Sequence, residues 1–307
     1  MSKRTTGGAL ATLIDPAATL RQIGEGYLFA EGPVWNAREG CLYFSDIPGD
    51  ARWRWSEGRG MELVARPTFK ANGMALDLDW SLLVCEHVSS CLVRIRPGGE
   101  RELVAFHYLG KYLNSPNDVI VRASDGSIYF TDPDYGRWND WVGQERNREL
   151  GFRGVFRVPP GGGDLQLLVN EDEFDQPNGL CFSPDESLLY INDSGGCNIK
   201  VFDVQSDGSL SNRRMFQDKV GTGVEREANV DGMECDELGN VWVTGPGGIW
   251  VINPDGERLG VIETDEVAGS LAWGGDDMRS LFLMTTTTAH VIETIVGPAP
   301  LPPFSEG

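Results

Sequence analysis

The sequence lacks the motifs of several familiar catalytic and metal sites. None of its six cysteines belongs to a CxxC pair, which disfavours a zinc site built from cysteine thiolates. It contains no GxSxG motif and no HExxH motif, which disfavours a serine-hydrolase elbow and a zincin-type metalloprotease. Most of the cysteines lie on or beside apolar segments, where we expect them to be reduced and buried.

Positive charge is also scarce. Lys and Arg together number 26 against 46 Asp and Glu, so the formal net charge is −20. Repulsion between like charges argues against nucleic acid or an anionic membrane as a partner. We expect most of these carboxylates to be solvated at the surface, but such an excess can also supply ligands for a cation.

Long apolar runs and long helical segments are missing as well. The N-terminal sequence MSKRTTGGALATL has a basic start, but Asp15 and Pro16 interrupt its apolar run, unlike in a signal peptide or a membrane span. We therefore expect a cytoplasmic protein. The longest helix-permissive stretch is short, roughly Asp140 to Leu150, while 39 glycines and 17 prolines are spread along the chain. These features favour an all-β fold.

A repeated pair of strands runs through the chain. Each copy has a small or polar opening residue, a short apolar strand, a turn rich in Asp, Gly or Ser, and a strongly apolar second strand that ends in polar residues. "EGPVWNAREGCLYFSD" and "NGLCFSPDESLLYIND" are two examples, and a third strand follows in several copies. The copies begin at Glu31, Asn72, Asn117, Asn178, Asp231 and, in degenerate form, Gly269.

The spacing of these copies predicts a six-bladed β-propeller. The period, roughly 40 to 60 residues, suits a blade of about four antiparallel strands, and six copies fill the chain. A barrel or sandwich is the alternative. The last copy lacks an outer strand, which the segment Ala18–Ile23 could supply, closing the ring and removing its open edge. We expect an N-terminal extension at 1–17, the propeller at 18–298 and a C-terminal tail at 299–307.

The opening residues should converge at one mouth of the central channel, since the first strand of every blade lines the channel in the same direction. They include two carboxylates and three amides but no thiol or imidazole. Such oxygens are ligands for hard cations such as Ca²⁺, Mg²⁺ or Mn²⁺. The alternative is that each opener only caps a turn, as Asn-Gly pairs commonly do.

The second strands run back toward the same mouth, so their ends should form its rim. His87 is the only histidine expected there, as a site residue or as a hydrogen-bonding turn residue. A long insertion at 133–154, with Trp138 and Trp141, could be a lid or a packed surface flap. The expected rim residues are Asp46, Glu86, His87, Asp132, Asp134, Tyr135, Asn192 and Asp193.

Together these segments resemble the SMP-30/gluconolactonase family of sugar lactonases over nearly the whole chain, from Glu31 to about Thr294. The matching stretches include "EGPVW", "LLVCEH", "LNSPNDVIV", "GSIYFTDPDYG", "QPNGLCFSPDESLLYIND" and "DGMECDELGNVWV". Any one of them is weak, but their joint order and spacing are specific. "LNSPND" and "ELGFRGV" resemble the bacterial and fungal gluconolactonase branch.

The resemblance implies one catalytic divalent metal near the channel mouth, held by Glu31, Asn178 and Asp231. Asn117 would be a substrate-binding residue or a fourth ligand. The chain departs from the family at two positions. Ser115 stands where vertebrate members have a sugar-contacting arginine, and Asp134 stands where the branch usually has proline, adding a carboxylate that could alter the preferred charge of the substrate.

The function we expect is therefore metal-dependent hydrolysis of a small sugar lactone. A divalent cation, Ca²⁺ before Mg²⁺, Mn²⁺ or Zn²⁺, would polarise the ring carbonyl while Asp231 takes a proton from the attacking water. The expected substrate contacts are Asn72, His87, Asn117 and Asp132. Two alternatives to a lactonase are an aryl-esterase or phosphotriesterase that uses the same site, and a non-catalytic propeller that binds calcium or a ligand.

Overall fold

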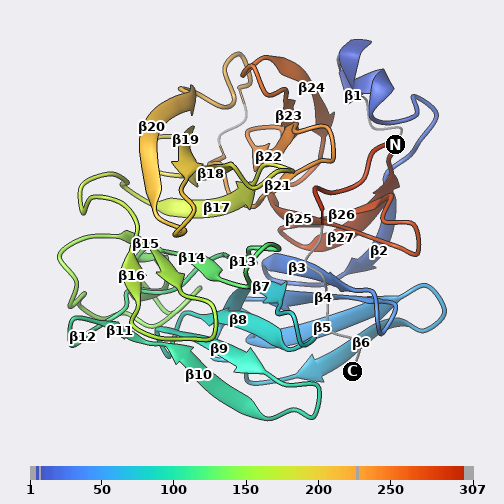
Figure 1. Ribbon diagram of the computed structural model, residues 1–307. Coiled ribbons are helices and arrows are strands. Elements are labelled where there is room, and N and C mark those ends of the chain that lie inside the picture. Colours follow the sequence, from blue (N-terminus) through green and yellow to red (C-terminus); the bar gives the residue numbers. More distant parts are fainter. Residues whose placement is uncertain (1–4, 7, 226–227, 301–307) are drawn as a thin grey trace.

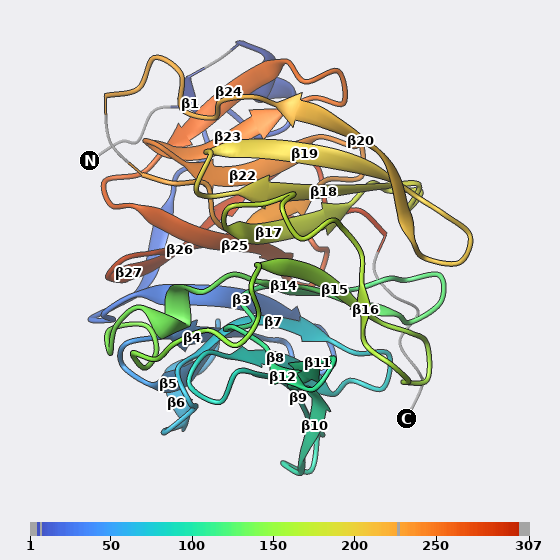
Figure 2. The same cartoon turned by 90° about the vertical axis from the view of Figure 1, so that its left-hand side faces the viewer.

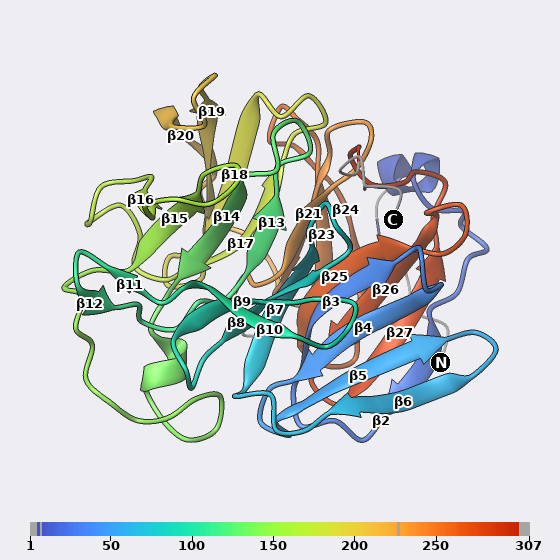
Figure 3. The same cartoon turned by 60° about the horizontal axis from the view of Figure 1, so that its bottom comes forward.

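The computed structural model describes residues 5–6, 8–225 and 228–300, and these form a ring of six β-sheets around a central channel (Figure 1). Five sheets have four strands and the sixth has five, and neighbouring strands within each sheet are antiparallel. The first strands of successive blades contact one another around the channel (Figure 3). The predicted six-bladed propeller is confirmed.

The strands of each blade follow one another from the channel outward. The first blade contains β3 (Ala30–Asn36), β4 (Cys41–Asp46), β5 (Ala51–Ser56) and β6 (Gly60–Ala65). The second contains β7 (Ala71–Leu76), β8 (Leu82–Glu86), β9 (Cys91–Ile95) and β10 (Arg101–Ala105). The third contains β13 (Val119–Val121), β14 (Ile128–Asp132), β15 (Gly154–Val158) and β16 (Gln166–Leu167). The fourth blade contains β17 (Pro177–Phe182), β18 (Leu188–Asp193), β19 (Asn198–Val204) and β20 (Leu210–Gln217). The fifth contains β21 (Met233–Cys235), β22 (Val241–Gly245), β23 (Gly248–Ile252), β24 (Arg258–Glu263) and the short outer strand β1 (Thr5–Thr6).

The sixth blade closes the ring with a strand from the other end of the chain. It contains β25 (Ala268–Gly274), β26 (Ser280–Thr285), β27 (Thr288–Glu293) and β2 (Arg21–Glu25), which pairs with β27 (Figure 1). The closing strand begins later than the predicted Ala18–Ile23. The Asp15 carboxylate accepts the Ala17 N–H at 2.8 Å and the Asp15 carbonyl accepts the Ala18 N–H, so these residues form a turn before the strand starts.

The core lies between the blades. Five clusters of buried hydrophobic side chains each join two neighbouring blades, and in a sixth the buried side chains of the second blade pack against the partly buried Val34 and Tyr43 of the first. The second strands are buried along nearly their whole length, as in β8, because blades cover both of their faces. This explains their near-continuous apolar sequence, while outer strands such as β10 alternate between exposed and partly buried positions.

Residues before the closing strand also contribute to this core. A short 3₁₀ helix, η1 (Gly8–Thr12), is followed by Leu13 and Ile14, which pack with Leu10 against the cluster between the fifth and sixth blades. We keep 18–298 as the proposed propeller domain, with 8–14 packed on it as an extension. Of the proposed tail, 301–307 lie outside the described residues, while the Ala299 N–H donates to the Cys235 carbonyl.

Two irregular elements lie on the third-blade side of the ring. A small hairpin of β11 (His107–Tyr108) and β12 (Lys111–Tyr112) connects the second and third blades, and the 3₁₀ helix η2 (Tyr135–Arg137) begins the long insertion between β14 and β15 (Figure 2). All six cysteines are buried and free, as expected for reduced core residues. None of the helices in the described ranges has the length and apolar character needed to cross a bilayer.

Candidate functional site

The opening residues lie at the starts of the first strands, at one mouth of the channel. Glu31 and Asn178 are each 4% exposed, and Asn72 and Asn117 each 5%, so these polar side chains are buried. Asp231 immediately precedes the β21 region and is only partly exposed. Three of the openers come together: the Asp231 carboxyl lies within hydrogen-bonding reach of the Glu31 carboxyl and of the Asn178 amide.

Glycine follows several openers because the next blade's opener packs against it. A β-carbon on Gly73 would lie 2.5 Å from the Asn117 carbonyl oxygen, and one on Gly179 would lie 2.3 Å from the Asp231 carbonyl oxygen. The Gly73 N–H also donates to the Asn117 carbonyl at 2.8 Å. The Asn-Gly pairs are therefore more than turn signals, since they allow neighbouring blades to place their openers side by side.

This close approach gives a stability prediction. Gly73→Ala should lower the free energy of unfolding by about 2 to 3 kcal/mol, because the new methyl group meets backbone atoms that belong to another blade. Gly98→Ala is the matched control, since nothing lies within 4 Å of its β-carbon position, and we expect a change within about 0.5 kcal/mol. Urea unfolding measures both, and equal stabilities would contradict the packing argument.

The two carboxyl groups strongly affect each other's protonation. Burial raises the pKa of Glu31 well above its usual value, and the neighbouring Asp231 raises it further. Burial likewise raises the pKa of Asp231 to about 7, with Asp118 adding to the rise and hydrogen bonds from Glu31 and Asn178 opposing it. The buried Glu31 carboxyl and the adjacent Asp231 carboxyl therefore disfavour each other's negative charge, and a bound positive charge would stabilise both.

The oxygen atoms of this cluster suit a hard divalent cation. One Glu31 oxygen, Oε2, accepts the Gly32 N–H at 2.9 Å, whereas Oε1 is buried and has no hydrogen-bond partner. Gly269 leaves room beside that atom, since a β-carbon there would lie 2.4 Å from it. No group of three or more His, Cys, Asp or Glu in the described part of the chain could hold a metal, so further ligands would have to be other oxygen atoms, and the Asn178 amide next to Asp231 is a candidate.

Asn178 is fixed from the second strand of its own blade. Its Nδ2 donates to Ser194 Oγ at 3.0 Å, and that hydroxyl donates to the Val230 carbonyl at 2.6 Å, just before Asp231. Asn192 Nδ2 donates to the Asp231 carbonyl at 2.5 Å. Ser194 and Asn192 thus join the fourth and fifth blades beneath the candidate ligands, a role that only the register of β18 against β17 reveals.

Aspartates at the ends of the second strands hold the loops that lead into the openers. Both oxygens of Asp132 accept backbone N–H groups, from Asn114 at 2.8 Å and Ser115 at 2.9 Å, and Asp132 is fully buried. Asp46 and Asp193 accept backbone N–H groups of their own blades in the same way. Substrate contact by Asp132 stays a prediction; the contacts present make it a clamp for the segment before Asn117.

His87 lies beneath the insertion rather than open to the channel mouth. It is 1% exposed, its Nδ1 lies 2.7 Å from the Val142 carbonyl, and its Nε2 lies 3.4 Å from Asn72 Nδ2. Since a carbonyl only accepts, Nδ1 carries the proton and Nε2 faces the amide. Burial lowers the pKa of His87 to about 4, with the positive charges of Arg146 and Lys70 adding to this and the hydrogen bond to Val142 opposing it.

This pKa shift predicts a pH dependence of stability. The folded state holds His87 neutral while the unfolded chain binds a proton near pH 6.5, so its stabilising effect is present above pH 6.5 and is lost as the pH falls toward 4. Between pH 7 and pH 4.5, wild type should lose about 2 to 3 kcal/mol more than His87→Gln. Urea unfolding at both values tests this, with His107→Gln at an exposed histidine as the control. Parallel losses in wild type and His87→Gln would contradict it.

The insertion between β14 and β15 is anchored by arginines that bind backbone carbonyls. Arg137 donates to the Asn114 carbonyl at 2.6 Å and to the Asn147 carbonyl at 2.7 Å. Arg146 donates to the His87 carbonyl at 2.9 Å and to Ser90 Oγ at 2.5 Å. These contacts favour a packed cover over a loosely attached lid.

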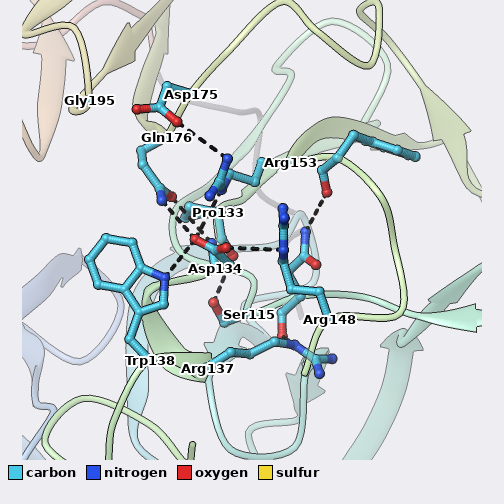
Figure 4. Close-up of polar contacts among 12 residues, drawn as sticks. Ser115, Pro133, Asp134, Arg137, Trp138, Arg148, Arg153, Asp175, Gln176 and Gly195 are labelled. Carbon is cyan, nitrogen blue, oxygen red and sulfur yellow. Dashed lines mark hydrogen bonds and ion pairs between the residues drawn. The ribbon is translucent and has the colours of Figure 1, made fainter. Parts of the chain in front are cut away.

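Asp134, the residue that departs from the family pattern, is the centre of a second network in the insertion (Figure 4). Its carboxylate pairs with Arg148 at 3.2 Å and Arg153 at 3.0 Å, and it accepts Gln176 Nε2 at 2.7 Å and Trp138 Nε1 at 3.0 Å. Despite burial, the hydrogen bonds from Arg153 and Gln176 lower its pKa. Asp134 therefore holds the insertion together, and its negative charge is paired with two arginines rather than directed at a substrate.

Sequence reasoning missed two acidic residues farther along the channel. Asp118 follows Asn117, and burial raises its pKa to about 7. Glu234 lies in β21, and burial together with Asp118 raises its pKa to about 8. An apolar pocket lined by Glu234, Leu76 and Trp273 lies along the first strands, but none of the openers lines it, so the candidate site is the oxygen cluster at the mouth.

Known proteins resemble this chain over most of its length. Residues 29–288 match the model of the SMP-30/gluconolactonase/LRE-like region. A gluconolactonase of Zymomonas mobilis is 32% identical over 271 residues, which cover 82% of this chain and 74% of that protein. The structure of a gluconolactonase from Xanthomonas campestris superposes with a TM-score of 0.86 at 32% identity, covering 96% of this chain and 95% of that one. A calcium-binding protein, regucalcin, from Agrobacterium tumefaciens shares the fold, with a TM-score of 0.75 at 19% identity and coverage of 94% and 97%.

Proposed function

Because this chain belongs to the SMP-30/gluconolactonase/LRE-like family, we propose that it is a sugar lactone hydrolase that works with one bound divalent cation, Ca²⁺ in the first instance. The observation that carries the proposal is that Asp231 lies within hydrogen-bonding reach of both Glu31 and Asn178, three residues from different blades, and that one buried oxygen of Glu31 has no hydrogen-bond partner. The named relatives act on lactones, and the oxygen donors suit a hard cation.

Glu31, Asn178 and Asp231 would hold the cation, with Asn117 as a further ligand or a substrate contact. When bound, the cation supplies a Lewis acid that polarises a carbonyl group and a positive charge that stabilises an oxyanion. The two carboxylates would balance its charge, and burial of Glu31 would keep competing water away from this part of the site.

In the reaction, the oxygen of a water molecule forms a bond to the lactone carbonyl carbon, and the ring C–O bond then breaks. Asp231 accepts the proton of the attacking water and returns it to the ring oxygen, which becomes a hydroxyl group of the product aldonic acid. Asn72 and Asn117 orient the substrate from the neighbouring blades, and the neutral His87 holds Asn72 in place.

Tyr135 is a further candidate contact. Burial raises its pKa, a hydrogen bond with Ser194 opposes this, and the charge of Asp231 adds to it, so its hydroxyl lies next to Ser194. The tyrosine is only partly buried. It could donate a hydrogen bond to a substrate hydroxyl at the edge of the site.

Hydrolysis assays test the proposed function. We expect glucono-1,5-lactone and related sugar lactones to be hydrolysed faster by the protein than in buffer, and faster than phenyl acetate or paraoxon. Preference for either of those esters would instead support an aryl-esterase or phosphotriesterase. No turnover of any of them would leave a binding propeller and overturn the proposal. A cytoplasmic location is part of the same proposal, in keeping with a small-molecule substrate.

A further inference from the structure

Trp138 presents a large aromatic surface to solvent beside the candidate site. Its side chain is 52% exposed, although Arg137 and Arg146 of the same insertion anchor that insertion to backbone carbonyls. An exposed indole offers a flat apolar face of the kind that binds the C–H-rich face of a sugar ring. Many exposed aromatic side chains bind nothing, but an indole that is held in one orientation is better suited to bind a ligand.

The ring of Trp138 is fixed on two sides. Its Nε1–H donates to Asp134 Oδ1 at 3.0 Å (Figure 4). Its ring centroid lies 4.8 Å from that of Tyr135 in an edge-to-face contact. Asp134 is itself held by Arg148, Arg153 and Gln176. The polar network thus fixes the orientation of an aromatic ring that packing alone leaves half exposed, and this lowers the entropic cost of stacking a ligand on it.

The network also places Trp138 next to the candidate metal ligands but outside them. Tyr135 lies between Trp138 and the Ser194 hydroxyl, which binds Asn178. Gln176, the other partner of Asp134, precedes Asn178 by two residues. Tyr135 and Ser194 thus connect Trp138 to the candidate ligand Asn178, so a ring stacked on Trp138 would be a second part of a ligand bound at the site.

Charges around the ring favour a neutral group. The two guanidinium groups, Arg148 and Arg153, are matched by two carboxylates, Asp134 and Asp175, the latter 3.3 Å from Arg153. Formal charges in this group thus sum to zero. A phosphate or sulfonate would have to displace Asp134 from its arginines, whereas an uncharged sugar ring needs only the exposed indole face.

We propose that Trp138 forms an aromatic subsite that binds the second sugar ring of a disaccharide-derived aldonolactone, while the lactone ring occupies the candidate site. This inference rests on the proposed lactonase function and adds the substrate class. Trp138 is the residue in contact with substrate, and Asp134 is a positioning residue that holds the indole in its orientation.

Kinetics with two lactones test the subsite. Wild type should have a higher kcat/KM for cellobiono-1,5-lactone than for glucono-1,5-lactone. Trp138→Ala should lower kcat/KM for cellobiono-1,5-lactone about five- to tenfold more than for glucono-1,5-lactone, mainly through KM. Trp138→Phe should retain most of the difference because it keeps an aromatic face. Equal losses on both lactones in Trp138→Ala, or a wild type that prefers 6-phosphogluconolactone to both, would overturn the subsite.

Trp141 provides the matched control. It lies in the same insertion and is 53% exposed, but its backbone N–H and carbonyl contact Asn139 and Lys70 rather than the Asp134 network. Trp141→Ala should leave both kcat/KM values within about twofold. A selective loss on cellobiono-1,5-lactone in Trp141→Ala instead of Trp138→Ala would place the subsite elsewhere and overturn the assignment.

A binding measurement separates failure of the subsite from failure of the proposed function. The non-hydrolysable cellobiono-1,5-lactam should bind wild type about five- to tenfold more tightly than glucono-1,5-lactam in calorimetric titration, and Trp138→Ala should lose this advantage. Equal affinities in wild type would reject the subsite even if lactones are hydrolysed. The expected binding pattern without turnover of any lactone would reject the proposed function and retain the subsite.

Discussion

Asp231→Asn is expected to lower kcat/KM for glucono-1,5-lactone by about 10³-fold, the largest effect of any single substitution in this chain. The change removes the proton acceptor for the attacking water and one of the two carboxylates that would hold the cation. The protein should still fold, because Asp231 lies against Glu31 and loss of its charge relieves repulsion between two adjacent acids. Steady-state kinetics and thermal unfolding of the cation-free protein measure the two effects.

Glu234→Gln is the matched control for this prediction. Glu234 lies three residues farther along the same segment and is also acidic and channel-lining, but its raised pKa, about 8, keeps it mostly protonated at pH 7. Glutamine resembles the neutral acid in size and charge, so kcat/KM should stay within about twofold. If Asp231→Asn kept wild-type activity, or if Glu234→Gln lost as much as Asp231→Asn, the assignment of Asp231 would be wrong.

The propeller could be predicted from sequence because its unit is local. Each blade carries its own pair of apolar strands and its own turn, so the pattern recurs even where single copies such as that at Gly269 are degenerate. Convergence of the openers then follows from the shared direction of the first strands. The start of the closing strand could not be predicted as well, because a turn at Asp15 set by one side-chain hydrogen bond delays it.

The roles of the polar residues at the rim were harder to predict, because they depend on which backbone lies nearby. Sequence position places Asp132 near the mouth, but only the fold shows that both of its oxygens face the N–H groups of Asn114 and Ser115. The Asp134 network is harder still. Its arginines follow at irregular spacings of 14 and 19 residues within an insertion that has no periodicity, so no sequence pattern links them.

Removal of divalent cations is expected to abolish lactone hydrolysis, with a loss of about 10² or more that Ca²⁺ restores. The physical reason is the unpartnered, buried oxygen of Glu31 and the second carboxyl beside this residue, since both groups need a positive charge to remain ionised together. Activity measured after dialysis against EDTA, followed by titration with Ca²⁺, Mg²⁺, Mn²⁺ and Zn²⁺, tests the requirement and ranks the metals. Full activity after complete removal would contradict it.

Thermal unfolding connects that requirement to these residues rather than to a cation bound elsewhere. At a cation concentration one hundred times the dissociation constant, binding to the folded state alone stabilises it by about 2.7 kcal/mol, which raises Tm by about 4 °C for a chain of this size. Glu31→Gln should remove most of this shift, since it deletes a charged ligand without changing the volume of the side chain. Because Glu234→Gln leaves the three proposed ligands intact, it should keep the shift. A shift that persists in Glu31→Gln would place the cation away from the channel mouth, and the hydrolytic mechanism would then lose its electrophile.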